Sequence, residues 1–248
     1  EIGSGLVGSE MCIRDSFEDP YGKTFKNRKR HSPESVKLAK TIADESTVLL
    51  KNENQLLPLD TKSLKSIAII GPNADQVQFG DYTWSRNNKD GVTPLQGIKN
   101  RVNKNTAIHY AKGCSLTSLD TSGIAEAVEA ARNSEVAVIF GGSASAALAR
   151  DYKSSTCGEG FDLNDLNLTG AQSQLIREVY RTGTPVILVL VTGKPFVIEW
   201  EKNNLPAILV QWYAGEQAGN SIADILFGEV VPLSLIHISE PTRPEPIS

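Results

Sequence analysis

Five short runs of apolar residues, separated by segments with helical periodicity, constrain the fold of this chain most strongly. Each run is rich in Ile and Val and is apolar on both faces of an extended strand, which predicts strands buried on both sides. The predicted strands are residues 66–70, 107–110, 136–140, 186–191 and 207–211. The predicted helices between or after them are residues 94–102, 122–133, 169–181 and 216–226. This alternation predicts an α/β fold, a mostly parallel sheet with helices on both faces.

The segment before the first strand predicts one more helix. Ser32 can cap its amino end and Pro33 suits its first helical position. Apolar residues then recur at helical spacing, so we predict a helix over residues 33–51. Residues 17–32 carry no periodicity and are predicted to be an interdomain linker, whose basic stretch is a solvated charge run. Residues 33–232 are predicted to form a single α/β domain.

The two ends of the chain share a nucleotide-level relationship. Residues 233–243 can be encoded by a DNA sequence whose complementary strand, read in a shifted frame, encodes residues 6–15. That DNA sequence resembles a sequencing-library adapter. We therefore expect residues 1–16 and 233–248 to be non-native segments outside the domain, and such segments are set aside before the fold is considered.

Composition argues against several classes of partner. A net charge of −4 gives no indication of a nucleic-acid partner. No apolar run reaches the ~18–20 residues that a membrane-spanning helix requires, so we expect no membrane partner. Outside the adapter-like ends the cysteines are Cys114 and Cys157, which lack the spacing of metal ligands. A disulfide between them stays open at this point.

The loops after the predicted strands are the expected place for a binding site, because ligands of open α/β sheets bind beyond the carboxyl ends of the strands. The longest such loop, residues 141–168, carries Glu159 between Gly158 and Gly160. Glycine on both sides allows a ligand to approach the backbone closely. A carboxylate presented in this way suits proton transfer to or from a substrate. On the residues alone, the alternative is a solvated surface charge.

A set of motifs in a fixed order runs through the chain. They are residues 49–52 (LLKN), 56–59 (LLPL), 67–74 (IAIIGPNA), 80–84 (GDYTW), 193–195 (GKP), 211–219 (QWYAGEQAG) and 223–228 (ADILFG). Together with the loop around Glu159, they make the chain resemble the second, α/β-sandwich domain of glycoside hydrolase family 3, whose best-known members are β-glucosidases. The resemblance implies that Glu159 is the general acid/base. One departure is Leu163, where many relatives carry Arg after the Asp.

Tyr82, Trp84 and Arg86 lie on a polar loop after the first predicted strand and are candidate substrate-binding residues. Aromatic rings and a guanidinium group suit the C–H faces and hydroxyls of sugars, and the family loop often contributes an aromatic residue to the cleft. The alternative is aromatic packing at a domain interface. Trp212 and Tyr213 follow a buried strand and are interpreted as structural. Asp162 and Asp165 are interpreted as caps of the helix that starts near Leu168.

The resemblance implies a fragment of a larger multidomain enzyme, a retaining exo-acting β-glycosidase. The activity that the resemblance implies first is that of a β-glucosidase, which hydrolyses terminal β-D-glucosyl residues of β-linked oligosaccharides or glycosides. It also implies an N-terminal barrel domain that carries the nucleophile, a periplasmic or secreted location, and no metal or organic cofactor. The chain alone is then expected to be inactive. The alternatives are a β-xylosidase or another exo-glycosidase of the same family, and a non-catalytic carbohydrate-binding domain.

Overall fold

The chain is described here from a computed structural model. The structure describes residues 31–83, 88–145, 156–158, 161 and 163–234. The chain divides into two compact units, Glu1–Val36 and Lys37–Ser248. In the first unit the described residues are 31–36, which include the first turn of helix α2 (Pro33–Ser46). All the strands described below belong to the second unit.

Seven strands in the described part of the second unit form one sheet, in the order β3-β2-β4-β5-β6-β1-β7. They are β1 (Val48–Asn52), β2 (Ser66–Ile70), β3 (Ala107–Ala111), β4 (Val136–Gly142), β5 (Val186–Val191), β6 (Ala207–Val210) and β7 (Leu233–Ser234). Strands β2 to β6 pair in parallel, whereas β1 runs antiparallel to β6. The predicted mostly parallel α/β sheet is confirmed.

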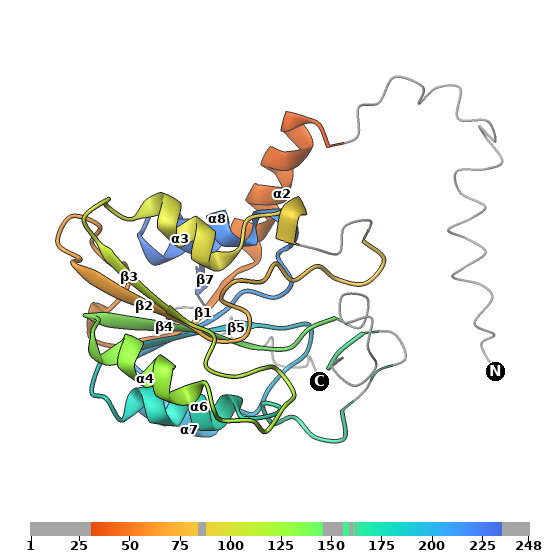
Figure 1. Cartoon of the computed structure of the whole chain (residues 1–248). Coiled ribbons are helices and arrows are strands. Elements are labelled where there is room, and N and C mark those ends of the chain that lie inside the picture. Colours follow the sequence, from red (N-terminus) through yellow and green to blue (C-terminus); the bar gives the residue numbers. More distant parts are fainter. Residues whose placement is uncertain (1–30, 84–87, 146–155, 159–160, 162, 235–248) are drawn as a thin grey trace, which may run out of the picture. The chain divides into compact units, whose positions relative to one another are not determined.

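Helices cover both faces of this sheet (Figure 1). On one face lie α3 (Pro94–Arg101) and α8 (Ala218–Leu226), and on the other lie α4 (Ile124–Arg132), α6 (Gln172–Tyr180) and α7 (Glu199–Asn204). Short 3-10 turns are η2 (Glu53–Gln55), η3 (Asn88–Asp90) and η4 (Gly215–Gln217). Four of the five predicted helices are observed within a few residues of their predicted bounds; α7, of six residues, was not predicted.

Burial on both faces explains why the strands are continuous apolar runs. In β2, Ile67 and Ile69 point into the core formed with α3 and α8. Their neighbours Ala68 and Ile70 point into the core formed with α4 and α6. All four side chains are fully buried. Because burial of one large aliphatic side chain stabilises by about 1.5–3 kcal/mol, this two-sided pattern contributes strongly to the fold.

The helix predicted over residues 33–51 is shorter than expected. Helix α2 ends at Ser46, and the hydroxyls of Ser46 and Thr47 donate to the Ala43 carbonyl oxygen at 3.2 Å and 3.0 Å. Val48–Asn52 is instead the strand β1, which pairs with the otherwise open edge of β6. The prediction was wrong here because a run of three apolar residues fits both the helical period and the strand period. Pairing with β6 makes this segment a strand.

Strand β7 bears on the predicted carboxyl boundary of the domain. Its two residues come from the segment expected to be non-native, and Leu233 N donates to Thr47 O at 3.0 Å. The pairing is limited to Leu233 and Ser234, and the Leu233 side chain is half exposed. Residues 1–16 and 235–248 lie outside the described residues. The boundaries at residues 16 and 232 therefore stay predictions, and β7 is the observation that argues against the second.

Candidate active site

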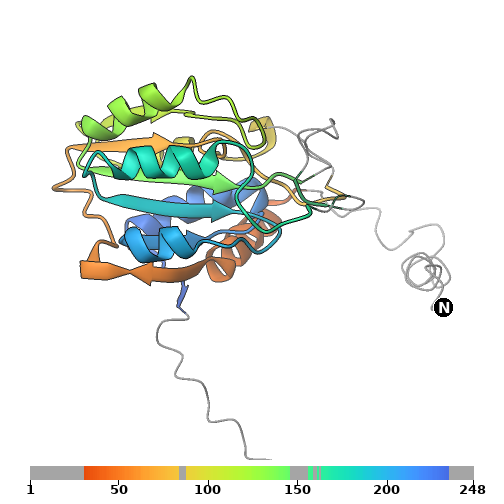
Figure 2. The ribbon, with the colours of Figure 1, turned by 90° about the horizontal axis from the view of Figure 1, so that it is seen from below.

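The strand order places a topological switch point between β2 and β4. From β2 the chain passes through α3 to β3, which lies on one side of β2. From β3 it then passes through α4 to β4, which lies on the other side of β2. Right-handed crossovers in opposite directions put α3 and α4 on opposite faces, as Figure 1 shows. The loops that leave β2 and β4 therefore diverge at the carboxyl edge of the sheet, where Figure 2 shows them projecting. Ligands of such sheets bind in the crevice between diverging loops.

Asn73 joins these two loops. Its side chain is fully buried, and Nδ2 donates to the carbonyl oxygens of Gly141 (3.3 Å) and Ser143 (3.2 Å). Its Oδ1 accepts from Gln78 Nε2 at 2.7 Å. Both hydrogen-bonding ends of one amide are thus used to fix the loop after β2 against the loop after β4. The switch point is consequently a rigid base for whatever the outer parts of the loops carry.

A second link lies further out along the same loops. The Ser145 hydroxyl donates to the Asp81 carboxylate. Next to Asp81, Tyr82 has φ +62°, an unusual conformation for a residue with a side chain, and its side chain is 81% exposed. The predicted substrate-binding loop and the predicted acid/base loop therefore meet at this edge. Trp84 and Arg86, the other two predicted substrate-binding residues, lie outside the described residues.

Glu159 also lies outside the described residues, but the backbone that leads to it is described. Ala144 N donates to Thr156 Oγ1 (2.9 Å), and Thr156 N donates to Ala144 O (3.3 Å). Cys157 then forms a parallel bridge with Ser145. Gly158 has φ +127°, a conformation that favours glycine, and bridges to Phe161. The stem of the acid/base loop, residues 156–158, is therefore paired with the chain that continues β4.

Buried hydroxyl groups lie beneath this stem. Ser143 is fully buried, and its Oγ lies 2.6 Å from the Tyr213 hydroxyl and 3.0 Å from Thr192 Oγ1. Burial, together with the neighbouring Cys157 side chain, raises the pKa of Tyr213 well above its usual range, despite the hydrogen bond to Ser143. At physiological pH the phenol is protonated and able to donate. The sequence alone led us to interpret Tyr213 as structural and gave Ser143 no role.

Two other sequence interpretations can be compared with the structure. Trp212, interpreted as structural, has φ +57° and a side chain that is 43% exposed. Asp165 accepts from Asn167 N at 2.8 Å, so it caps a turn and not helix α6, which begins at Gln172. The capping prediction for Asp165 was wrong, because the helix starts later than expected; Asp162 lies outside the described residues.

Within the described residues, no group of three or more His, Cys, Asp or Glu side chains could hold a metal ion. Cys114 and Cys157 are free thiols, and burial raises the pKa of Cys114 to about 11. None of the helices that the structure describes is long and apolar enough to span a bilayer. The cofactor and membrane expectations stay predictions.

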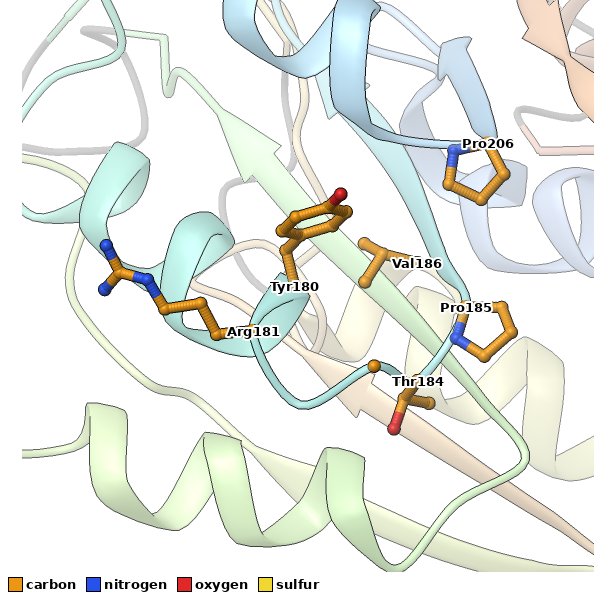
Figure 3. Close-up of a pocket in the computed structure, with 7 residues that line it drawn as sticks. Tyr180, Arg181, Thr184, Pro185, Val186 and Pro206 are labelled. Carbon is orange, nitrogen blue, oxygen red and sulfur yellow. The ribbon is translucent and has the colours of Figure 1, made fainter.

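A separate pocket of about 370 Å³ opens at the other edge of the sheet, at the amino ends of β5 and β6 (Figure 3). It is lined by Tyr180, Arg181, Gly183, Thr184, Pro185, Val186 and Pro206. The Tyr180 ring packs edge-on against Trp200, with ring centroids 5.4 Å apart. In Figure 3 the Arg181 side chain points away from the other labelled residues. Tyr82, the one predicted site residue among the described residues, does not line this pocket.

The chain is a doubly wound α/β domain, a class whose ligands bind at the switch point of the sheet. Its family follows from comparison with known proteins. The family model of the glycosyl hydrolase family 3 C-terminal domain matches residues 47–243, so the chain belongs to that family.

Three similar proteins illustrate the relationship. The chain is 39% identical to a β-xylosidase of Formosa agariphila and 36% identical to a periplasmic β-glucosidase of Salmonella typhimurium, over 84% and 83% of its own length. A β-glucosidase of Listeria innocua, solved in complex with isofagomine, superimposes over 86% of this chain with a TM-score of 0.69 and 27% identity. The chain spans 28% of the length of each of these three proteins.

Proposed function

We propose that this chain supplies the general acid/base, Glu159, of a retaining exo-acting β-glycosidase. Family membership supports the class of reaction. The observation that carries the assignment is the stem at residues 156–158, which fixes the start of the Glu159 segment to the carboxyl end of β4 at the switch point. The loop that holds Tyr82 is tied to the same place through Asp81.

The proposed reaction has two steps. Glu159 first donates its proton to the glycosidic oxygen while a carboxylate nucleophile attacks the anomeric carbon, which gives a covalent glycosyl-enzyme and frees the leaving alcohol. The Glu159 carboxylate then removes a proton from water as that water attacks the intermediate. Retaining glycosidases hold their two carboxyl groups ~5–5.5 Å apart. We propose that the nucleophile belongs to a barrel domain that packs against the carboxyl edge of the sheet.

Substrate contacts from this chain are proposed for Tyr82, Trp84 and Arg86. An exposed aromatic ring offers a flat apolar surface to the C–H face of a sugar, and a guanidinium group can donate to its hydroxyls. The 81% exposure of Tyr82, at the edge where the two loops meet, leaves its ring available for this role, and packing at a domain interface is the alternative. The chemistry uses no metal or organic cofactor.

The proposed substrate is a glycoside or oligosaccharide with a terminal β-D-glucosyl residue. A β-xylosidase is an equally supported alternative, because the β-xylosidase of Formosa agariphila and the β-glucosidase of Salmonella typhimurium are similar to this chain to nearly the same degree. A barrel domain would form most of the pocket for the terminal sugar, so it would decide between the two substrates.

The test uses a fusion enzyme in which residues 17–232 replace the matching segment of the Formosa agariphila β-xylosidase. Glu159→Ala should slow hydrolysis of disaccharides such as xylobiose or cellobiose far more than that of activated aryl glycosides, whose leaving groups depart with little protonation. Glu126→Ala, at an exposed glutamate on α4, is the matched control. Disaccharide hydrolysis near the parent rate in the Glu159→Ala enzyme would refute the assignment. A fusion that bound glycosides but hydrolysed none would favour the carbohydrate-binding alternative.

A further inference from the structure

The hydroxyl groups beneath the acid/base loop form a directional chain of hydrogen bonds. Ser143 Oγ donates to Thr192 Oγ1 (3.0 Å), which donates to Lys194 O (2.7 Å). Since the single Ser143 proton is used in this way, the short 2.6 Å contact between Ser143 and Tyr213 has the tyrosine as donor. Gly193 N also donates to Ser143 Oγ, at 3.3 Å. The hydrogen-bonding groups of the buried Ser143 hydroxyl are therefore all occupied.

The Tyr213 ring connects this chain to the loop stem. A Cβ atom added at Gly193 would lie 2.7 Å from Tyr213 Cε2 and 2.9 Å from Cys157 Sγ. Both contacts are shorter than packed atoms allow, so the ring and the thiol occupy the space beside Gly193 together. Cys157 is thus paired with Ser145 through the backbone, and its thiol lies beside the Tyr213 ring.

We propose that Tyr213 and Ser143 are positioning residues for the acid/base loop: the Tyr213 ring, fixed by the hydrogen bond of its hydroxyl to Ser143, packs beside the Cys157 thiol and so orients the backbone that enters Glu159. The inference rests on the proposed function of Glu159. Neither residue is assigned contact with the substrate. A carboxyl group that must meet a glycosidic oxygen tolerates little displacement, because an error near 1 Å can cost up to about 10²-fold in rate.

The first test measures the stem directly, in the full 248-residue chain. Tyr213→Phe and Ser143→Ala should each raise the rate at which iodoacetamide alkylates Cys157, by several fold, as followed by peptide mapping. The buried thiol of Cys114 is the internal control, and Tyr180→Phe, at the opposite edge of the sheet, is the matched tyrosine control. Equal Cys157 rates in the parent and both variants would overturn the inference. Melting curves of both variants check that they remain folded.

The second test separates positioning from general destabilisation, in the fusion enzyme. Tyr213→Phe should lower kcat/KM for a disaccharide roughly tenfold, and should leave kcat/KM for an activated aryl glycoside, whose first step needs little protonation, within about twofold. A general loss of structure would lower kcat/KM for both substrates alike, and this result would overturn the inference. No loss of kcat/KM for either substrate would also overturn it. If Glu159→Ala spares disaccharide hydrolysis, the proposed function fails. If Glu159→Ala impairs it but Tyr213→Phe does not, only the positioning inference fails.

Discussion

At the scale of single residues, Asn73 is the polar side chain on which the site depends most. It satisfies one carbonyl group at the end of β4, one in the residue after β4, and one amide of its own loop, in a place that water does not reach. A buried polar group that loses its partner costs about 1–3 kcal/mol, so the consequence of removing Asn73 exceeds that of one exposed hydrogen bond.

Asn73→Ala should therefore lower the free energy of unfolding by about 2–3 kcal/mol. Asn100→Ala removes an exposed amide that accepts from Gln96 Nε2 on α3, and it should change stability by less than about 0.5 kcal/mol. Urea denaturation of the full chain measures both. A loss at Asn73 no larger than that at Asn100 would show that the bridge between the loops is not a stabilising contact.

Tyr213 gives a dependence of stability on pH. Its pKa is raised above the ordinary value of about 10 by burial, so its contribution to stability is fully present below pH ~10 and is lost as pH rises through the raised pKa. Tyr213→Phe cannot ionise. Its unfolding free energy should thus fall less steeply than that of the parent between about pH 10 and 11. Denaturation across this range measures the two slopes, and equal slopes would contradict the raised pKa.

At the scale of elements, the crossing of α3 and α8 is set by two glycines. A Cβ at Gly97 would lie 1.9 Å from Gly219 O, and one at Gly219 would lie 2.1 Å from Thr93 O. These neighbours are backbone atoms, which cannot rotate away as a side chain can. The two helices therefore approach closely enough to form the layer over one face of the sheet only because both positions lack a side chain.

Gly97→Ala should lower the free energy of unfolding by about 1–3 kcal/mol. This loss is expected even though Ala favours a helix interior over Gly by up to about 1 kcal/mol. Gly80→Ala is the matched control, since a Cβ there meets no heavy atom within 4 Å. A thermal melt compares the two, and an unchanged or raised Tm for Gly97→Ala would mean that the helices can separate at no cost.

The same scale shows which parts of the fold are predictable from sequence. Strands β2, β4, β5 and β6 were predicted because burial on both faces demands apolar residues at nearly every position, whereas the edge strand β3 is only partly buried. Strand β1 was mistaken for the end of a helix because its few apolar residues fit both periods. The hydrogen bond between Tyr213 and Ser143 was not predicted, since Ser143 lies 70 positions earlier in the chain and leaves no local signal near Tyr213. The site loops were predictable because they follow the strands at one edge.

At the scale of the whole molecule, the account divides a retaining mechanism between this chain and a barrel domain. Residues 17–232 expressed alone should then show no Glu159-dependent hydrolysis of aryl β-glucosides or aryl β-xylosides. An acid/base carboxylate without its nucleophile cannot form the glycosyl-enzyme, and general acid–base catalysis alone contributes only ~10²–10⁴-fold. An assay from about pH 4 to 8 tests this, and turnover that disappeared in Glu159→Ala would show that the chain holds a complete site.

The central claim, that Glu159 is the acid/base, is tested most directly by azide rescue of the Glu159→Ala fusion enzyme. With an activated aryl glycoside the first step needs little proton donation, so the glycosyl-enzyme should accumulate. Azide needs no general base and should attack that intermediate, restoring turnover and giving a glycosyl azide with retained configuration. Failure of azide to raise turnover, or a glycosyl azide of inverted configuration, would contradict the assignment of Glu159.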